Sequence, residues 1–168
     1  MKRVTETFLL PCTPDVFWQV SMDPAYLRAL FLDGLGFNGF EVLEISATTR
    51  KLRVVPRMNL PEPLAKIVGD AFAYEEHGEL DRGRSEWKWR MVQPRNARLP
   101  ELIGTSGTVR VEPIGDGQCR RTDELILEGK LFGLGRIIEA AAEKEARAAW
   151  GKEPPFFARW LERKGTPP

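Results

Sequence analysis

The feature that most constrains the fold is a long stretch of alternating apolar and polar residues, from Phe37 to about Glu128. The alternation is clearest from Glu86 to Met91 (EWKWRM), where the charged side chains share one face and two Trp and a Met share the other. Short turn sequences at 81–83 (DRG) and 115–117 (GDG) separate alternating runs. Strands with one apolar face, one polar face and short connections predict a meandering antiparallel sheet with one side toward water.

The residues before this stretch predict one strand and two short helices. The segment from Lys2 to Leu10 is rich in Thr, Val and Phe and is followed by a proline, which is typical of a strand. Thr13 and Asp23 each precede a proline, the pattern of an N-cap followed by Pro at the first helical position. We therefore expect two helices in tandem, the second of them ended by the glycines at 34 and 36.

The end of the chain returns to helical spacing. Apolar residues recur every three or four positions from Leu134 to Ala149, which predicts a long helix beginning near Leu134. Gly151 and the Pro154-Pro155 pair are expected to end or kink this helix. The aromatic residues at 156, 157 and 160 then mark a further short helical piece, which either packs back on the domain or forms an exposed apolar tip. Residues 164–168 are expected to fray.

This order of elements predicts a single domain over residues 1–168 with an α+β fold. In that fold a curved antiparallel sheet of about seven strands wraps around the long C-terminal helix, and two short helices follow strand one. A chain of 168 residues is long enough to bury roughly 70% of its unfolded surface. The predicted inward stripe of the helix is mostly alanine (residues 141, 142, 148 and 149), and such small side chains leave room for a cavity.

The charge balance and the ends of the chain argue against several classes of protein. Lys and Arg number 25 and Asp and Glu number 24, whereas nucleic-acid and polybasic membrane-surface binders need a clustered basic excess. No apolar run reaches the ~18 residues of a membrane span. The N-terminal segment is too short and too polar for a signal peptide, so we expect a cytoplasmic protein without integral membrane association.

The residues that carry common site chemistry are scarce. A single histidine, His77, and two cysteines far apart in the sequence cannot supply the ligands of a zinc site. The sequence has no P-loop, no dinucleotide-binding fingerprint and no Gly-x-Ser-x-Gly nucleophile elbow. We therefore expect no metal and no cofactor.

Short motifs resemble a known superfamily. The opening at 11–18 (PCTPDVFW), followed by 23–27 (DPAYL), resembles the start of START-like (SRPBCC) proteins, which include birch-pollen allergens, polyketide cyclases and lipid-transfer domains. The segments 60–64 (LPEPL), 68–70 (VGD) and 74–76 (YEE) are similar to a bacterial branch, domain-of-unknown-function family 2505. The resemblance covers Val4 to Leu161 and implies a helix-grip fold with a hydrophobic ligand cavity. It fixes no activity, because this cup hosts carriers, enzymes and regulators.

The inward-facing residues of the predicted sheet and helix are the candidate ligand-binding residues. The Trp and Met residues of 86–91 form either an aromatic wall of a cavity or ordinary core packing against the helix. By the same parity Glu76, Arg121 and Asp123 point inward and would orient the head of an amphiphile, unless they lie at an exposed strand end or a bulge. The candidate set is Phe72, Tyr74, Glu76, Trp87, Trp89, Met91, Val109, Asp123, Leu125, Leu127, Ile138, Ala141 and Ala142.

Three further features leave alternatives open or carry an expectation. His77 shares one side of its strand with acidic residues at 75, 79 and 81, and is either a general acid or base or part of a solvated outer face. The proline-rich segment 60–68 is either a gate to the cup or a plain connecting loop. If strand one pairs antiparallel with the last strand, Cys12 and Cys119 become neighbours, and we expect them to be free thiols.

The function that these patterns favour is non-catalytic binding or transport of a small hydrophobic or amphipathic ligand, such as a lipid. A first alternative is a cavity enzyme of the aromatase/cyclase or lyase type that uses Glu76, Tyr74 or Asp123 as acid or base. A second alternative is a protein-interaction module with a filled cavity. The expected partner is a small molecule and not a nucleic acid; transient membrane contact and the oligomeric state stay open.

Overall fold

The computed structural model describes residues 1–68, 72–95, 97 and 101–165. Its elements follow in the order β1 (Lys2–Leu10), α1 (Pro14–Ser21), α2 (Pro24–Ala29), a π-helical turn (Leu30–Gly34), β2 (Gly39–Ile45), β3 (Thr49–Val55), α3 (Glu62–Val68), β4 (Tyr74–Asp81), β5 (Glu86–Val92), β6 (Ile103–Gly115), β7 (Gln118–Gly129) and α4 (Gly135–Arg163).

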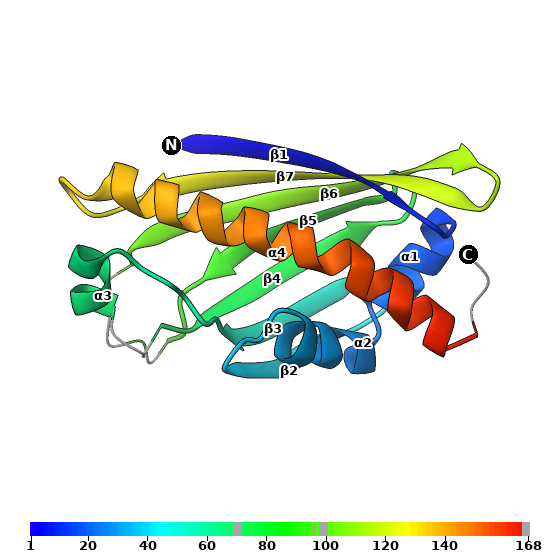
Figure 1. Cartoon of the computed structure of the whole chain (residues 1–168), viewed down its shortest axis with the longest axis horizontal. Coiled ribbons are helices and arrows are strands. Elements are labelled where there is room, and N and C mark those ends of the chain that lie inside the picture. The colour runs from blue at the N-terminus through cyan, green and yellow to red at the C-terminus, as the bar shows by residue number, and fades with distance from the viewer. Residues whose placement is uncertain (69–71, 96, 98–100, 166–168) are drawn as a thin grey trace.

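The strands form one seven-stranded antiparallel sheet in the order β1-β7-β6-β5-β4-β3-β2. Consecutive strands from β2 to β7 pair as a meander, and β1 joins the far edge by pairing with β7. The helix α4 crosses one face of this sheet along its length, with α3 near its N-terminal end and α1 and α2 toward its C-terminal half (Figure 1). The prediction of an α+β, helix-grip arrangement with two short helices after strand one is confirmed.

The two tandem helices begin at the predicted caps. The Thr13 hydroxyl accepts a hydrogen bond from the Val16 amide at 3.4 Å, and the Asp23 carboxylate accepts one from the Ala25 amide at 2.8 Å. Such caps satisfy amide groups that have no partner within the helix. They fix α1 and α2 so that their apolar residues, among them Trp18, are buried against one end of the sheet.

The expectation that the helix ends at Pro154 and Pro155 is wrong, because α4 runs through both prolines to Arg163. Each proline removes one amide donor from the helix, so the carbonyl groups four residues earlier lose their usual partners. Burial beyond the prolines outweighs this loss. Phe157 and Leu161 are 1% and 2% exposed, and the Phe157 ring centroid lies 5.7 Å from that of Tyr26. The C-terminal aromatic residues therefore pack on the domain and do not form an exposed tip.

The segment expected to be a loop or a gate contains a helix, α3. Its prolines come before the helix and in its first turn, where a missing amide donor costs nothing. The Pro61 carbonyl accepts hydrogen bonds from the amides of Leu64 and Ala65, both at 2.9 Å. Leu64 and Val68 are buried and anchor α3 to the domain. Downstream, β4 begins at Tyr74, and residues 69–71 lie outside the described residues.

The two cysteines are neighbours, as predicted from the closure of the sheet. The β1–β7 register places Leu10 opposite Cys119, and Cys12 follows two residues later. Both cysteines are fully buried thiols. The hydrogen bond to Cys119, together with burial, raises the pKa of the Cys12 thiol above its usual range. Among the described residues, no helix is both long and apolar enough to cross a membrane.

Candidate functional site

A cavity of about 330 Å³ lies between the sheet and α4. Its lining on α4 extends from Ile138 to Glu153, which corresponds to about 22 Å of helix. Residues of α1 and α2 line the cavity toward the C-terminal half of α4, and residues of α3 line it near the N-terminal end of that helix. The cavity is therefore elongated. This volume lies in the range of small-molecule sites.

The cavity wall includes every residue of the candidate set: Phe72, Tyr74, Glu76, Trp87, Trp89, Met91, Val109, Asp123, Leu125, Leu127, Ile138, Ala141 and Ala142. Their role in binding a ligand remains a prediction. Phe72 precedes β4 instead of lying within that strand. His77 is not part of the wall; its Nε2 lies 2.9 Å from Glu75, and it is 24% exposed.

The two tryptophans of β5 lie over glycines of the neighbouring strands. A side chain at Gly78 on β4 would collide with the Trp87 ring, and one at Gly107 on β6 would lie 2.5 Å from the Trp89 Nε1. Each indole therefore occupies space that a side chain on the next strand would otherwise fill. Trp87 belongs to the apolar cluster at the α1–α2 end, and Trp89 packs against both this cluster and the one that includes Ala142 of α4.

One residue of the expected alanine stripe on α4 does not lie on the inward face. Ala148 is exposed, and the cavity is lined by Ala146 instead. At 3.6 residues per turn, position 148 lies about 120° around the helix from Ala142, whereas position 146 lies about 40° from it. Glu145 also lines the cavity, and the described part of the chain offers its carboxylate no ion pair or hydrogen bond.

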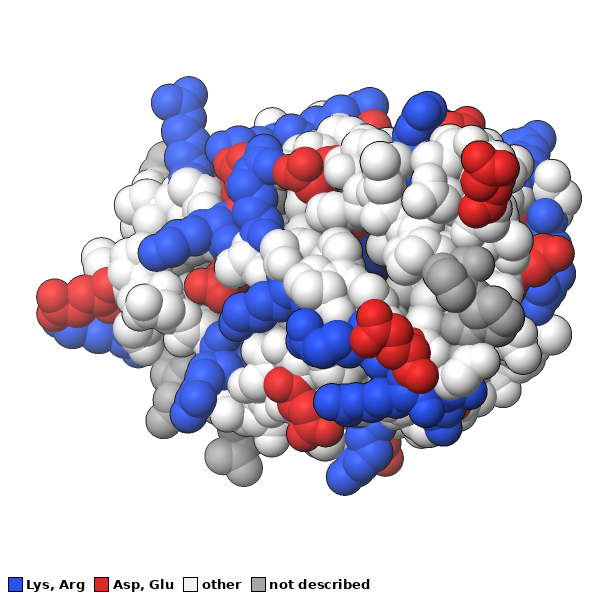
Figure 2. All heavy atoms as spheres, turned by 45° about the vertical axis from the view of Figure 1, so that its right-hand side comes forward, with Lys and Arg blue, Asp and Glu red and all other residues white. Residues whose placement is uncertain are grey.

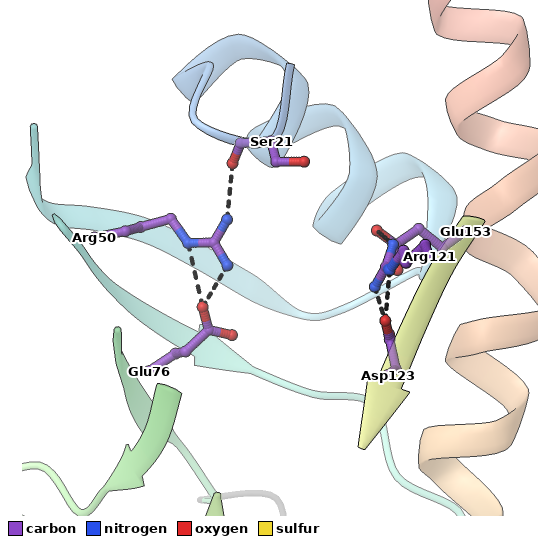
Figure 3. Close-up of polar contacts among 6 residues, drawn as sticks. All are labelled: Ser21, Arg50, Glu76, Arg121, Asp123 and Glu153. Carbon is purple, nitrogen blue, oxygen red and sulfur yellow. Dashed lines mark hydrogen bonds and ion pairs between the residues drawn. The ribbon is translucent and has the colours of Figure 1, made fainter. Parts of the chain in front are cut away.

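A first pair of charged side chains, Arg50 and Glu76, lies on the wall formed by β3 and β4 (Figure 3). The Arg50 Nε and Nη2 donate to one carboxylate oxygen of Glu76 at 3.2 and 2.5 Å, and its Nη1 donates to the Ser21 carbonyl at 2.8 Å. The guanidinium also lies 4.6 Å from the Trp87 ring centroid. The second Glu76 oxygen has no hydrogen-bond partner within the described ranges, and Figure 3 shows it directed toward Arg121 and Asp123.

A second group of charged side chains joins β7 to α4. Arg121 donates to both oxygens of Asp123 at 2.7 and 2.6 Å, and to Glu153 at 2.7 Å. Burial raises the pKa of Asp123, and the Arg121 guanidinium opposes that shift. The Trp150 side chain also lowers the pKa of Asp123. Burial lowers the pKa of Arg121, but Asp123 and Glu153 outweigh it and raise that pKa well above its usual value, so Arg121 stays charged.

Tyr26 lies on the wall near both groups of charges. It is 1% exposed, and its hydroxyl has no hydrogen-bond partner among the described residues. Burial raises the pKa of Tyr26, the charge of Glu153 adds to this, and the charges of Arg121 and Arg50 oppose it. We name Arg50, Glu76, Tyr26, Arg121, Asp123 and Glu153 together the polar end of the cavity.

Sequence reasoning placed Glu76, Arg121 and Asp123 inward but missed Arg50 and Glu153. Arg50 has the parity of Leu52 and Val54, so the alternation of β3 could have indicated its direction. Glu153 lies beyond the expected end of the helix and had no predicted place. On the face shown in Figure 2, basic and acidic side chains are interspersed.

The sequence matches the model of the family described as "protein of unknown function (DUF2505)" over residues 5–161. The chain belongs to the DUF2505 family. A search of curated proteins finds no matching sequence. The resemblance to START-like proteins and to this family is therefore confirmed at the level of family and fold.

Solved structures share the fold of this DUF2505 protein. Similar ones are the ZhuI aromatase/cyclase from Streptomyces sp. R1128 (TM-score 0.68, 15% identity, 97% of this chain and 94% of that chain) and a Thalictrum flavum norcoclaurine synthase mutant with a transition-state analogue (0.68, 19%, 97% and 96%). A START superfamily protein from Mycobacterium smegmatis matches with a TM-score of 0.60 at 11% identity, over 96% of this chain and 97% of that one. At these identities the likeness shows the fold alone.

Proposed function

We propose that this protein binds and carries a small amphipathic molecule in the cavity without changing it chemically. The observation that supports this most directly is a cavity of about 330 Å³ with mostly apolar walls and its buried charges gathered at a polar end. Such a space suits a ligand with an apolar body and a polar head. A lipid or a smaller amphiphile would both meet this description.

An enzyme of the aromatase/cyclase or lyase type remains the second candidate, favoured by the titratable groups on the cavity wall. The partners of those groups make it the weaker candidate. Glu76 is bonded to Arg50, Asp123 is bonded to Arg121, and burial raises the pKa of Tyr74, so none of the three acids is a free base. A filled interaction module does not agree with an open cavity of this size.

The carrier proposal is tested by blocking the cavity from α4. Ala141 lines the cavity and Ala148 lies on the exposed side of the same helix, so Ala141→Trp and Ala148→Trp form a matched pair. Nile red, an uncharged solvatochromic dye, is titrated into the wild type and both variants. We expect Ala141→Trp to weaken dye binding at least tenfold and Ala148→Trp to leave it unchanged.

Two readouts accompany that titration. Circular dichroism and thermal unfolding establish that both variants are folded. Native mass spectrometry of the wild type identifies any retained small molecule, and incubation with that molecule shows whether it is recovered unchanged. Equal dye binding by the wild type and a folded Ala141→Trp variant would contradict the cavity as the binding site, and conversion of the retained molecule would favour the enzyme.

A further inference from the structure

The charges on the cavity wall are unbalanced, and this bears on the kind of ligand the cavity takes. Within the described part of the wall, two guanidinium groups, those of Arg50 and Arg121, face four carboxylates, those of Glu76, Asp123, Glu145 and Glu153. Two other charged residues of the described wall, Arg57 and Glu124, have opposite charges and leave this balance unchanged. Arg57 is exposed, and the Glu124 carboxylate is bonded to Arg3 at 3.1 Å. The described part of the wall therefore carries an excess of two negative charges, and an excess of one remains if a proton resides on Asp123.

The guanidinium groups already donate hydrogen bonds to acceptors of the protein, whereas several carboxylate oxygens on the wall accept none from the described residues. Each arginine already donates three hydrogen bonds within the protein. By contrast, one Glu76 oxygen and both Glu145 oxygens lack partners in the described chain, although the Glu76 side chain is only 12% exposed. A ligand that displaces water from these oxygens must replace the hydrogen bonds that water made.

Tyr26 gives a second, independent indication of a ligand at the polar end. Its side chain is almost completely buried, it lines the cavity, and its hydroxyl is unpartnered in the described part of the chain. A buried hydroxyl without a partner is costly, so a ligand group that hydrogen-bonds to it is favoured. A phenol oxygen can accept from an ammonium group, and the rings of the wall suit a cation as well.

From these observations we propose that the ligand is an organic amine, whose ammonium group binds at the polar end on the free Glu76 oxygen while its apolar body lies along α4. This inference rests on the proposed function and specifies its ligand class. An anionic head, as in a fatty acid, would be repelled by the excess of negative charge. A neutral head would leave the carboxylates less well compensated than a cation does.

The test is a series of three ligands with one apolar body and different heads: decylamine, decanol and decanoate. Each displaces Nile red from the wild type at pH 7, where the amine is a cation and the acid an anion. We expect decylamine to bind at least tenfold more tightly than decanol, and decanoate to bind most weakly. Decylamine binding should be lost in Ala141→Trp, which shows that the amine occupies the cavity; in this variant it is measured by isothermal titration calorimetry, because the variant is expected to bind the dye poorly.

Two variants of β4 test the assigned carboxylate. Glu76→Gln removes the charge on the cavity wall, and Glu79→Gln makes the same change on an exposed residue of the same strand. We expect Glu76→Gln to reduce the preference for decylamine over decanol at least fivefold, and Glu79→Gln to preserve it. If Glu76→Gln does not fold, the wild-type series decides alone.

The outcomes separate this inference from the proposed function. Decanol or decanoate binding as tightly as decylamine would overturn the amine, as would a failure of decylamine to displace the dye, while dye binding itself would still support a carrier. A wild type that binds no dye would overturn the proposed function. A preference for the amine that Ala141→Trp leaves intact would place the amine outside the cavity and overturn the inference.

Discussion

Gly107→Ala should force the Trp89 indole away from the sheet and into the cavity. Gly107 is buried on β6 and pairs with Trp89 on β5, whose ring lies over it. A Cβ at this position would lie 2.5 Å from the Trp89 Nε1 and 2.6 Å from its Cε2. Ordinary contacts of this kind need about 3.5 Å, so the ring must move by about 1 Å. The cavity is the open space available to it.

The expected cost is the difference between two opposing effects. Overpacking a well-packed core costs typically about 1–3 kcal/mol, because side chains leave their preferred rotamers. The added methyl group offsets about 0.4–1 kcal/mol of this by restricting the unfolded chain. Central values of about 2 and about 0.7 kcal/mol leave a net loss of about 1.3 kcal/mol. For a chain of this length that corresponds to a Tm lowered by about 3–5 °C.

Urea unfolding, followed by tryptophan fluorescence and circular dichroism, measures the loss, and Nile red binding reports the narrowed cavity. The control is Gly151→Ala, since a Cβ at this position meets no heavy atom outside the helix backbone within 4 Å. Gly151 lies within α4, away from its ends, and is exposed to solvent. That variant should be more stable by about 0.5–1 kcal/mol. A double-mutant cycle with Trp89→Leu decides the cause. If Gly107→Ala costs the same with and without the indole, the collision with Trp89 is not the reason for the loss.

Three further expectations follow from the buried groups. Arg121→Ala should lower the free energy of unfolding by about 3–5 kcal/mol in urea, because it leaves buried carboxylates unpaired; a loss below about 1 kcal/mol would contradict this. Hydrogen bonds from neighbouring cations lower the pKa of Glu86 below its usual value of 4.5. The ionised carboxylate therefore stabilises the fold above pH 4.5, and this contribution is lost as the pH falls through the lowered pKa. The difference in unfolding free energy between the wild type and Glu86→Gln should shrink only below about pH 4.5. Cys12 and Cys119 should resist Ellman's reagent in the native state and react as two thiols after unfolding, since both are fully buried; rapid native labelling would show that the β1–β7 edge opens.

The parts of the fold that follow from local rules were predictable from the sequence. Period-two alternation identified the strands of the sheet, and capping residues such as Thr13 located the starts of the short helices. The errors occurred where tertiary packing outweighs a local signal. A seven-residue helix such as α3 is marginal alone and depends on burial of Leu64 and Val68, which no local pattern shows. The proline pair is likewise tolerated because Phe157 and Leu161 anchor the helix beyond it.

The sequence predicts which side chains of the site point inward, but it does not predict which residues they pair with. The alternation along β4 and β7 predicts that Glu76 and Asp123 point inward, because the face on which a residue lies follows from its position within its own strand. Their partners depend on neighbouring strands and on α4. Arg50 meets Glu76 through the β3–β4 register, in which Leu52 is the residue opposite Glu76. Glu153 meets Arg121 only because α4 continues beyond the position where its prolines suggested an end.

The energetics of the interior favour a binding role over a purely structural one. Buried ion pairs contribute little net stability, and well-packed apolar replacements are often neutral or stabilising by about 1–4 kcal/mol. An unfilled space also forfeits dispersion contacts that larger side chains on α4 would make. This protein has both features side by side, with Ala141 and Ala142 opposite an aromatic wall and Arg121 buried among carboxylates. A chain that needed only to fold would gain from removing them, so their arrangement is better explained by a molecule that enters the cavity and compensates the charges there.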